Sequence, residues 1–197
     1  MNKNEAIIKS IIVLLKAYRT FHGQINIDKA ALISFRYLLG QSIRQYDIPI
    51  ENYHISQAAF ERWEQLSKDK IERYHYRDLV KCNNLTKLYR FKQFKGASKS
   101  GNPRKLHPNG SFVFRDMFHE DHVIPVSLIL NELIQIKTVD ENSVKVQLNK
   151  MHICIILKEE DRKLGRTINR TANFLDTINN VYKPKGISLS DYNFSIV

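Results

Sequence analysis

The sequence predicts an α+β fold, in which a helical N-terminal region precedes a segment of short strands that alternate with helices. In the first 66 residues, apolar side chains recur at helical spacing between capping residues. From Phe112 onward, short runs rich in β-branched residues alternate with amphipathic stretches. With 197 residues and a hydrophobic fraction of 43%, the chain is long enough to bury one core with an added subdomain.

Three helices are predicted before residue 80. The first covers residues 5–22, where apolar residues form one broad face, and Gly23 ends it. Asp28 is the predicted N-cap of the second helix and Ser56 that of the third, because a short polar side chain can accept a hydrogen bond from a first-turn N–H group. The apolar stripes of these two helices are Ala31, Leu32, Phe35, Leu38 and Leu39, and Phe60, Trp63 and Leu66.

A basic segment follows, with no acidic residue from Leu79 to Arg115. Its Lys and Arg side chains, interleaved with aromatic residues, suit contact with a phosphate backbone, and a solvated basic loop is the alternative. The formal net charge of +11 also favours a polyanionic partner. The expected DNA-contacting residues of this segment are Lys87, Arg90, Lys92, Lys95, Lys99, Arg104, Lys105 and Arg115.

The remainder of the chain is expected to alternate between strands and helices. Pro125 should end a strand that includes Val123 and Ile124, because proline cannot donate to a sheet. The other expected elements are an extended Ser111–Phe114, a helix over Ser127–Ile136, a turn at Asp140 and Asn142, a buried strand over Met151–Leu157, a long helix over Lys158–Asn179 and a loop-like tail after Pro184.

Cysteine content and hydropathy indicate the compartment. Cys82 and Cys154 are far apart and form no C-x-x-C pair, which argues against a cysteine zinc site and a disulfide framework. The longest apolar runs are far shorter than a membrane span, and the N-terminus has no secretory pattern. The expected location is the cytoplasm, without membrane association.

The chemistry is expected in the stretch Phe-His-Glu-Asp-His-Val-Ile-Pro, residues 118–125. Asp121, His122 and the following Val-Ile-Pro resemble the first motif of the HNH endonucleases, also called ββα-metal or His-Me finger nucleases. In that family a strand and a helix with a further metal ligand follow, and the strand before Asp161 fits this order. The resemblance covers about residues 112–170.

The resemblance implies a phosphodiester-cleaving site that leaves a 5′-phosphate. His122 would act as the general base, and Asp121 and Asp161 would hold a divalent cation. An all-oxygen donor set favours Mg²⁺ or Mn²⁺ over Zn²⁺. Glu160 is the alternative helix ligand, but it shares the side of Leu164 and should point into the core.

Several nearby residues have supporting roles with more than one interpretation. The central asparagine of the family is missing from its usual place, and either Asn149 or His152 could replace it. His119 could touch the phosphate or serve as a structural residue at a strand edge. Arg162 and Arg166 could clamp the phosphate or form a solvated face.

The expected organisation is a helical region over 1–80, a basic DNA-contacting segment over 81–110, an HNH-like nuclease core over 111–180 and a C-terminal tail over 181–197. The expected function is a metal-dependent endonuclease acting on double-stranded DNA, of the type II restriction class. The expected assembly is either a monomer or a homodimer. The alternatives are a non-catalytic nucleic-acid-binding protein and a helical interaction module with an acidic protein partner.

Overall fold

The computed structural model describes residues 2–23, 28–67, 118–165 and 169–192, with the side chains of residues 63–67 excepted. The chain divides into two compact units, each assembled from separate stretches of sequence. Unit 1 contains Met1–Asn52, His122–Ile153 and Thr167–Val181; unit 2 contains Tyr53–Asp121, Cys154–Arg166 and Tyr182–Val197. The expected segment boundaries at residues 80 and 110 lie outside the described residues, as does the extended segment expected over Ser111–Phe114.

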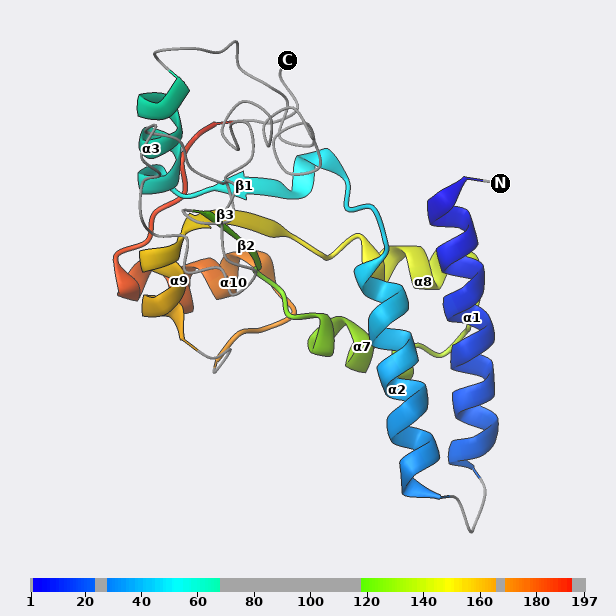
Figure 1. The fold of residues 1–197 in the computed structure, drawn as a ribbon. Helices are drawn as coiled ribbons and strands as arrows, with labels where there is room; N and C mark the ends of the chain where they lie inside the picture. The colour runs from blue at the N-terminus through cyan, green and yellow to red at the C-terminus, as the bar shows by residue number, and fades with distance from the viewer. Residues whose placement is uncertain (1, 24–27, 68–117, 166–168, 193–197) are drawn as a thin grey trace, which may run out of the picture. The chain divides into compact units, whose positions relative to one another are not determined.

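Unit 1 is built from helices. Helices α1 (Lys3–His22) and α2 (Lys29–Arg44) form a hairpin, and α7 (Val126–Gln135) and α8 (Glu141–Leu148) pack against it (Figure 1). The fully buried apolar side chains of these four helices are Ile11, Leu15, Leu39, Ile43, Ile129, Leu133, Val144 and Leu148. Burial of this apolar area is the main source of stability for the unit.

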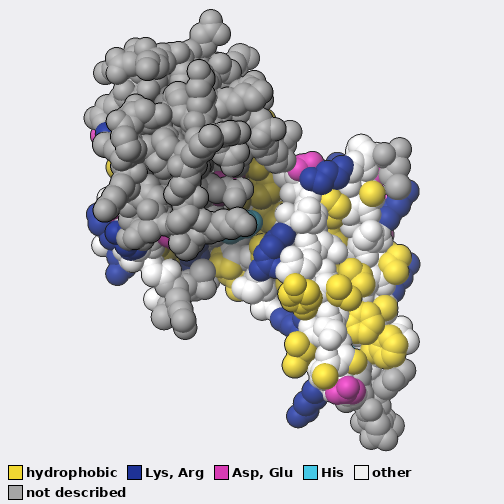
Figure 2. All heavy atoms as spheres, viewed as in Figure 1, with side chains coloured by type: hydrophobic (Ala, Val, Ile, Leu, Met, Phe, Trp, Pro, Cys, Tyr) yellow, Lys and Arg dark blue, Asp and Glu magenta, His cyan; other side chains and the backbone are white. Residues whose placement is uncertain are grey.

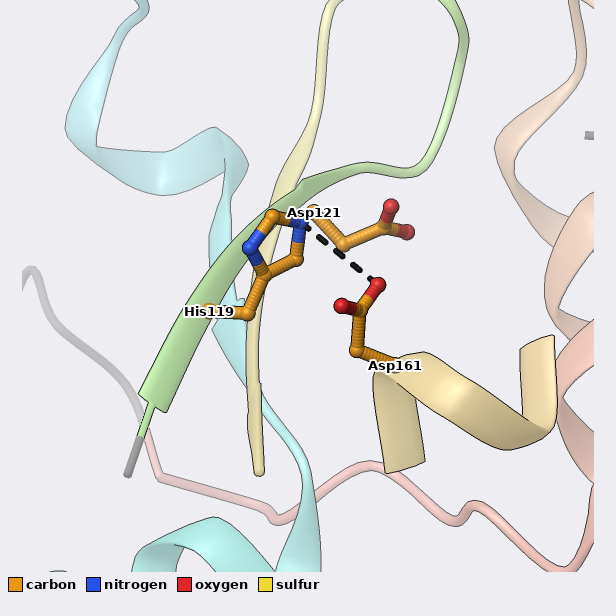
Figure 3. A group of neighbouring side chains, drawn as sticks. All are labelled: His119, Asp121 and Asp161. Atoms are coloured by element: carbon orange, nitrogen blue, oxygen red, sulfur yellow. Dashed lines mark ion pairs between the residues drawn. The ribbon is translucent and has the colours of Figure 1, made fainter. Parts of the chain in front are cut away.

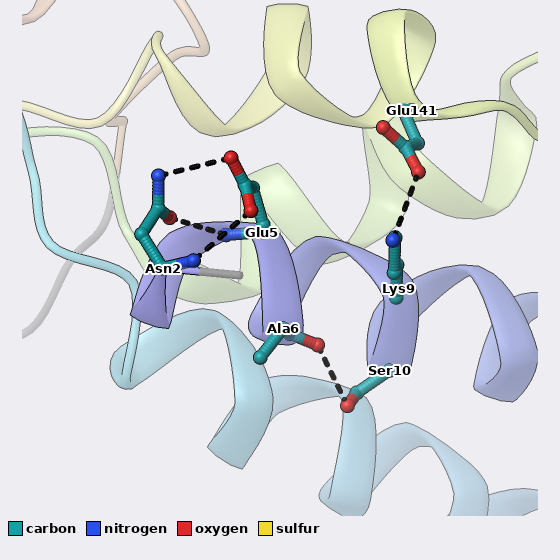
Figure 4. Close-up of polar contacts among 6 residues, drawn as sticks. All are labelled: Asn2, Glu5, Ala6, Lys9, Ser10 and Glu141. Carbon is teal, nitrogen blue, oxygen red and sulfur yellow. Dashed lines mark hydrogen bonds and ion pairs between the residues drawn. The ribbon is translucent and has the colours of Figure 1, made fainter.

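Side-chain caps fix the ends of these helices. Asn2 and Glu5 form a reciprocal capping box at the start of α1, and an ion pair of 4.0 Å joins Lys9 to Glu141 of α8 (Figure 4). The predicted cap of α2 is confirmed, because the Asp28 carboxylate accepts a hydrogen bond of 2.8 Å from the Ala30 N–H.

Unit 2 is organised around a three-stranded sheet in the order β1-β3-β2. The strands are β1 (Tyr53–Ile55), β2 (Phe118–His122) and β3 (Ile153–Leu157), and Figure 1 shows β2 running opposite to the central β3. Helix α3 (Gln57–Ser67) follows β1, and α9 (Lys158–Leu164) follows β3 directly. Along the chain, the neighbouring strands β2 and β3 and the helix α9 thus come in the order ββα, and the helices α7 and α8 lie between the two strands in sequence.

The long helix predicted for the C-terminal half is wrong. The long helix expected over Lys158–Asn179 ends at Leu164, because Gly165 has a φ of 62° and turns the chain out of the helix. The chain continues through α10 (Phe174–Thr177), a π-helical turn η2 (Ile178–Tyr182) and a 3₁₀ turn η3 (Lys183–Lys185). The described tail after Pro184 is mostly loop, as predicted, and it is attached to unit 2 because the Ser190 N–H donates to the Ile55 carbonyl at 2.9 Å and Ile187 is buried.

Two elements were not expected from the sequence: α8, which was interpreted as a turn, and the short strand β1 with its preceding 3₁₀ turn η1 (Ile50–Asn52). The α+β class is confirmed. Among the described residues, no helix has both the length and the apolar character that a membrane span requires.

Candidate metal centre

Strand β2 presents two potential ligands on the same side. Side chains alternate along a strand, so His119 and Asp121, two residues apart, share one face. The Asp121 residue is 9% exposed, whereas the His119 side chain is 37% exposed. The strand β2 ends at His122, before Val123 and Ile124, which the sequence had placed inside the strand.

Helix α9 supplies the third group. Asp161 lies in its first turn, and its Oδ1 is 3.6 Å from Nε2 of His119. One ligand atom each from His119, Asp121 and Asp161 falls within 4.8 Å of the others. Figure 3 shows the three side chains converging from β2 and α9.

Tyr182, which is far from Asp121 in the sequence, contacts the Asp121 carboxylate. Its side chain is completely buried, and its phenol O–H donates a hydrogen bond to Oδ2 of Asp121. Such partners fix the orientation of a carboxylate ligand and keep it ready for a cation. No local pattern announces this role, because 61 residues separate Tyr182 from Asp121.

Glu160 has a different set of partners from Asp161. It is 6% exposed, and its Oε2 accepts hydrogen bonds from the Ser56 hydroxyl at 2.6 Å and the Leu157 N–H at 2.8 Å. Ser56 also accepts from the Ala59 N–H at 3.1 Å, so it is the N-cap predicted for α3. Glu160 thus ties the start of α9 to the start of α3 and is not a member of the group around His119.

The donor set fits a divalent cation. One imidazole nitrogen and two carboxylate oxygens are common ligands of Mn²⁺, Zn²⁺ and related ions. The two carboxylates would repel each other in the absence of a cation, and a charge of +2 would offset both. With His119, this group offers one nitrogen atom besides the two carboxylates of the expected all-oxygen site.

His122, the predicted base, immediately follows Asp121 and is half-buried. Its backbone carbonyl accepts a hydrogen bond of 2.6 Å from the Arg170 guanidinium, whose side chain is buried. Arg170 was not singled out in the sequence. Its contact holds the backbone carbonyl of the last residue of β2.

Neither candidate for the missing asparagine belongs to the group of three. Asn149 caps the end of α8, and its Oδ1 accepts from the Tyr46 hydroxyl at 2.9 Å. The His152 ring stacks on Phe174 with the ring centres 4.3 Å apart. Burial lowers the pKa of His152 to about 4, so its ring is neutral at pH 7.

The predicted DNA contacts lie mostly outside the described residues. This applies to Arg166 and to Lys87, Arg90, Lys92, Lys95, Lys99, Arg104, Lys105 and Arg115. Arg162 is described, and its side chain is exposed on α9. It is one residue beyond Asp161 along the helix.

No protein-family model, curated protein or solved structure matches the chain.

Proposed function

We propose that the chain is a metal-dependent endonuclease that hydrolyses phosphodiester bonds of double-stranded DNA, with a type II restriction enzyme as its narrower class. One observation carries the proposal: His119 and Asp121 of strand β2 converge with Asp161 of helix α9, and His122 directly follows Asp121 in the chain. The ββα order of β2, β3 and α9 is also the order of the HNH endonucleases that the motif resembles.

Each residue of the site would have a separate role in hydrolysis. Asp121 and Asp161 would hold a divalent cation, which when bound supplies positive charge to the phosphate and the leaving oxygen. His122 would accept the proton of the attacking water, so that hydroxide character develops on the water oxygen as it forms a bond to phosphorus and the bond from phosphorus to the 3′-oxygen breaks. Tyr182 keeps Asp121 in one orientation, and the exposed Arg162 is available to a DNA phosphate. The products would be a 3′-hydroxyl and a 5′-phosphate.

Plasmid cleavage tests the proposal. Wild-type protein should cut supercoiled DNA with Mg²⁺ or Mn²⁺ and lose all activity in EDTA. Asp161→Asn should abolish cutting, whereas Glu159→Gln should retain it, because Glu159 is an exposed acid of the same helical turn and makes no part of the group. Cleavage that persists in EDTA, or that survives Asp161→Asn, would refute the proposal.

A second candidate function belongs to unit 1: binding of an acidic protein partner. Figure 2 shows hydrophobic side chains gathered over α1 and α2 with basic residues among them. Val13 and Ile33 are each 67% exposed and Tyr37 is 64% exposed, and exposed apolar side chains that gather into one patch are typical of interaction surfaces. The basic residues of these two helices are Lys3, Lys9, Lys16, Arg19, Lys29, Arg36 and Arg44, whereas Glu5 is their only acid.

An acidic amphipathic peptide provides the assay for this candidate. It should bind the wild-type protein in fluorescence anisotropy, and the double variant Ile33→Ser, Tyr37→Ser should bind it more weakly. Equal binding by the two proteins would remove the surface from consideration.

A further inference from the structure

We infer that His119 is a third, nitrogen ligand of the cation site, and that the site therefore prefers a first-row transition-metal ion such as Mn²⁺ or Co²⁺ over Mg²⁺. The inference deepens the proposed function, on which its biological meaning rests, by assigning the cation class. The juxtaposition of His119 with Asp161 and Asp121 carries it.

The distance between His119 and Asp161 does not suit a direct hydrogen bond. The separation of 3.6 Å between Nε2 and Oδ1 exceeds the 2.7–3.2 Å of ordinary N–H···O bonds. It does suit two ligands of one ion, because ligands about 2.1 Å from a metal lie about 3.0–3.4 Å from each other when they are neighbours in its coordination shell. A closure of a few tenths of an ångström would complete the pair.

A surface ion pair is the competing explanation for this contact. Both side chains are more than one-third exposed, and exposed pairs contribute little to stability. A divalent cation would instead be coordinated by both carboxylates and by the imidazole nitrogen together.

The nearby contacts support a prepared ligand set. Buried Tyr182 holds one oxygen of Asp121, while Glu160 is bonded to Ser56 and Leu157 in the core. Asp161 is therefore the acid of the first turn of α9 that the fold presents to His119. These side chains come from β2, α9 and η2, so the site is assembled by the fold of unit 2 and not by one local segment.

The ligand chemistry determines the cation class. Mg²⁺ prefers oxygen ligands and keeps much of its water shell, so an added imidazole stabilises it little. Affinity for a nitrogen-containing site rises from Mn²⁺ through Co²⁺ to Ni²⁺. His119 should thus contribute strongly to binding of these ions and weakly to binding of Mg²⁺.

Direct spectroscopy of bound Mn²⁺ tests the inference without any cleavage assay. Pulsed electron paramagnetic resonance of the full-length wild-type protein with one equivalent of Mn²⁺ should show ¹⁴N coupling from a directly bound nitrogen. The coupling should disappear in His119→Gln and persist in His122→Ala, which separates the two histidines of β2. If His119→Gln does not fold, coupling that persists in His122→Ala still excludes His122 as its source, and a wild-type spectrum without ¹⁴N coupling overturns the inference.

Calorimetric titration gives an independent measurement. His119→Gln should weaken Co²⁺ and Mn²⁺ binding by at least about tenfold, the lower end of what loss of even an outer-shell partner costs. Its Mg²⁺ affinity should change by less than about twofold, since oxygen ligands dominate there. His22→Gln is the matched control, because His22 is an exposed histidine of α1, and it should change neither affinity.

The outcomes distinguish the inference from the proposed function. Mn²⁺ binding without ¹⁴N coupling would overturn the inference and leave a nuclease with carboxylate ligands. Coupling that depends on His119, in a protein that does not cut DNA, would support the inference and refute the nuclease. Absence of any Mn²⁺ binding would overturn both.

Discussion

The bond between Ser56 and Glu160 should be a major determinant of the stability of unit 2. Ser56→Ala removes the donor to Glu160, and a hydrogen bond to a buried charged group contributes about 1.5–3 kcal/mol. The same change removes the N-cap of α3, which contributes about 1 kcal/mol. The expected loss is therefore about 2.5–4 kcal/mol in the free energy of unfolding.

Thermal and urea unfolding measure this loss. For a chain of this length, each kcal/mol lowers the Tm by about 2–4 °C, so the expected fall is about 5–15 °C. Glu159→Gln is the control: this exposed neighbour should change stability by less than about 0.5 kcal/mol.

A double-mutant cycle isolates the contact itself. Ser56→Ala and Glu160→Gln should show a coupling energy of at least about 1 kcal/mol, as expected for residues in direct contact. The reasoning is refuted if Ser56→Ala costs less than about 1 kcal/mol, or if the two changes are additive within about 0.5 kcal/mol.

Three further predictions concern other parts of the chain. The pKa of His152 is lowered from 6.5 in the unfolded chain to about 4 in the folded protein, so the unfolded chain binds this proton first as the pH falls. The contribution of His152 to the free energy of unfolding is therefore present above pH 6.5 and is lost as the pH falls towards 4. Urea unfolding between these pH values should show a weaker pH dependence in His152→Gln, and an unchanged dependence would exclude His152. Gly165→Ala should destabilise the protein by about 1–3 kcal/mol through its positive φ, whereas Gly23→Ala, with a φ of −79°, should cost less; equal costs in thermal unfolding would contradict the assignment. Replacing Lys92, Lys95, Arg104 and Lys105 by Ala should flatten the slope of log K for DNA against log salt by about 3–4, as expected for four lost phosphate contacts, and an unchanged slope would place the DNA surface elsewhere.

Local side-chain chemistry made the N-terminal helices predictable. Asp28 and Ser56 cap helices through hydrogen bonds to residues two or three positions away, which a sequence displays directly. The same chemistry was misinterpreted at Asp140, whose carboxylate accepts from the Ser143 N–H and begins α8 instead of making only a turn. The strand β1 has three residues and is defined by its pairing with β3, so it has almost no local signal.

The site could be predicted in part for similar reasons. The motif predicted Asp121 as a ligand, and the start of the helix after the buried strand predicted Asp161. The structure brings the two side chains together. His119 could have been found from the two-residue period of a strand, had β2 been predicted over Phe118–His122. Tyr182 could not, because only the folded chain brings it to Asp121.

The rate at which the His122→Ala variant cleaves DNA most directly tests the central claim, that His122 is the general base of a nuclease. Loss of a general base typically costs about 10²–10⁴-fold in rate, while cation and DNA binding do not require the imidazole of His122. Single-turnover cleavage of a labelled duplex, with Mn²⁺ and saturating protein, should therefore fall by that factor in His122→Ala at unchanged DNA affinity. Cleavage within a few-fold of wild type would contradict the account.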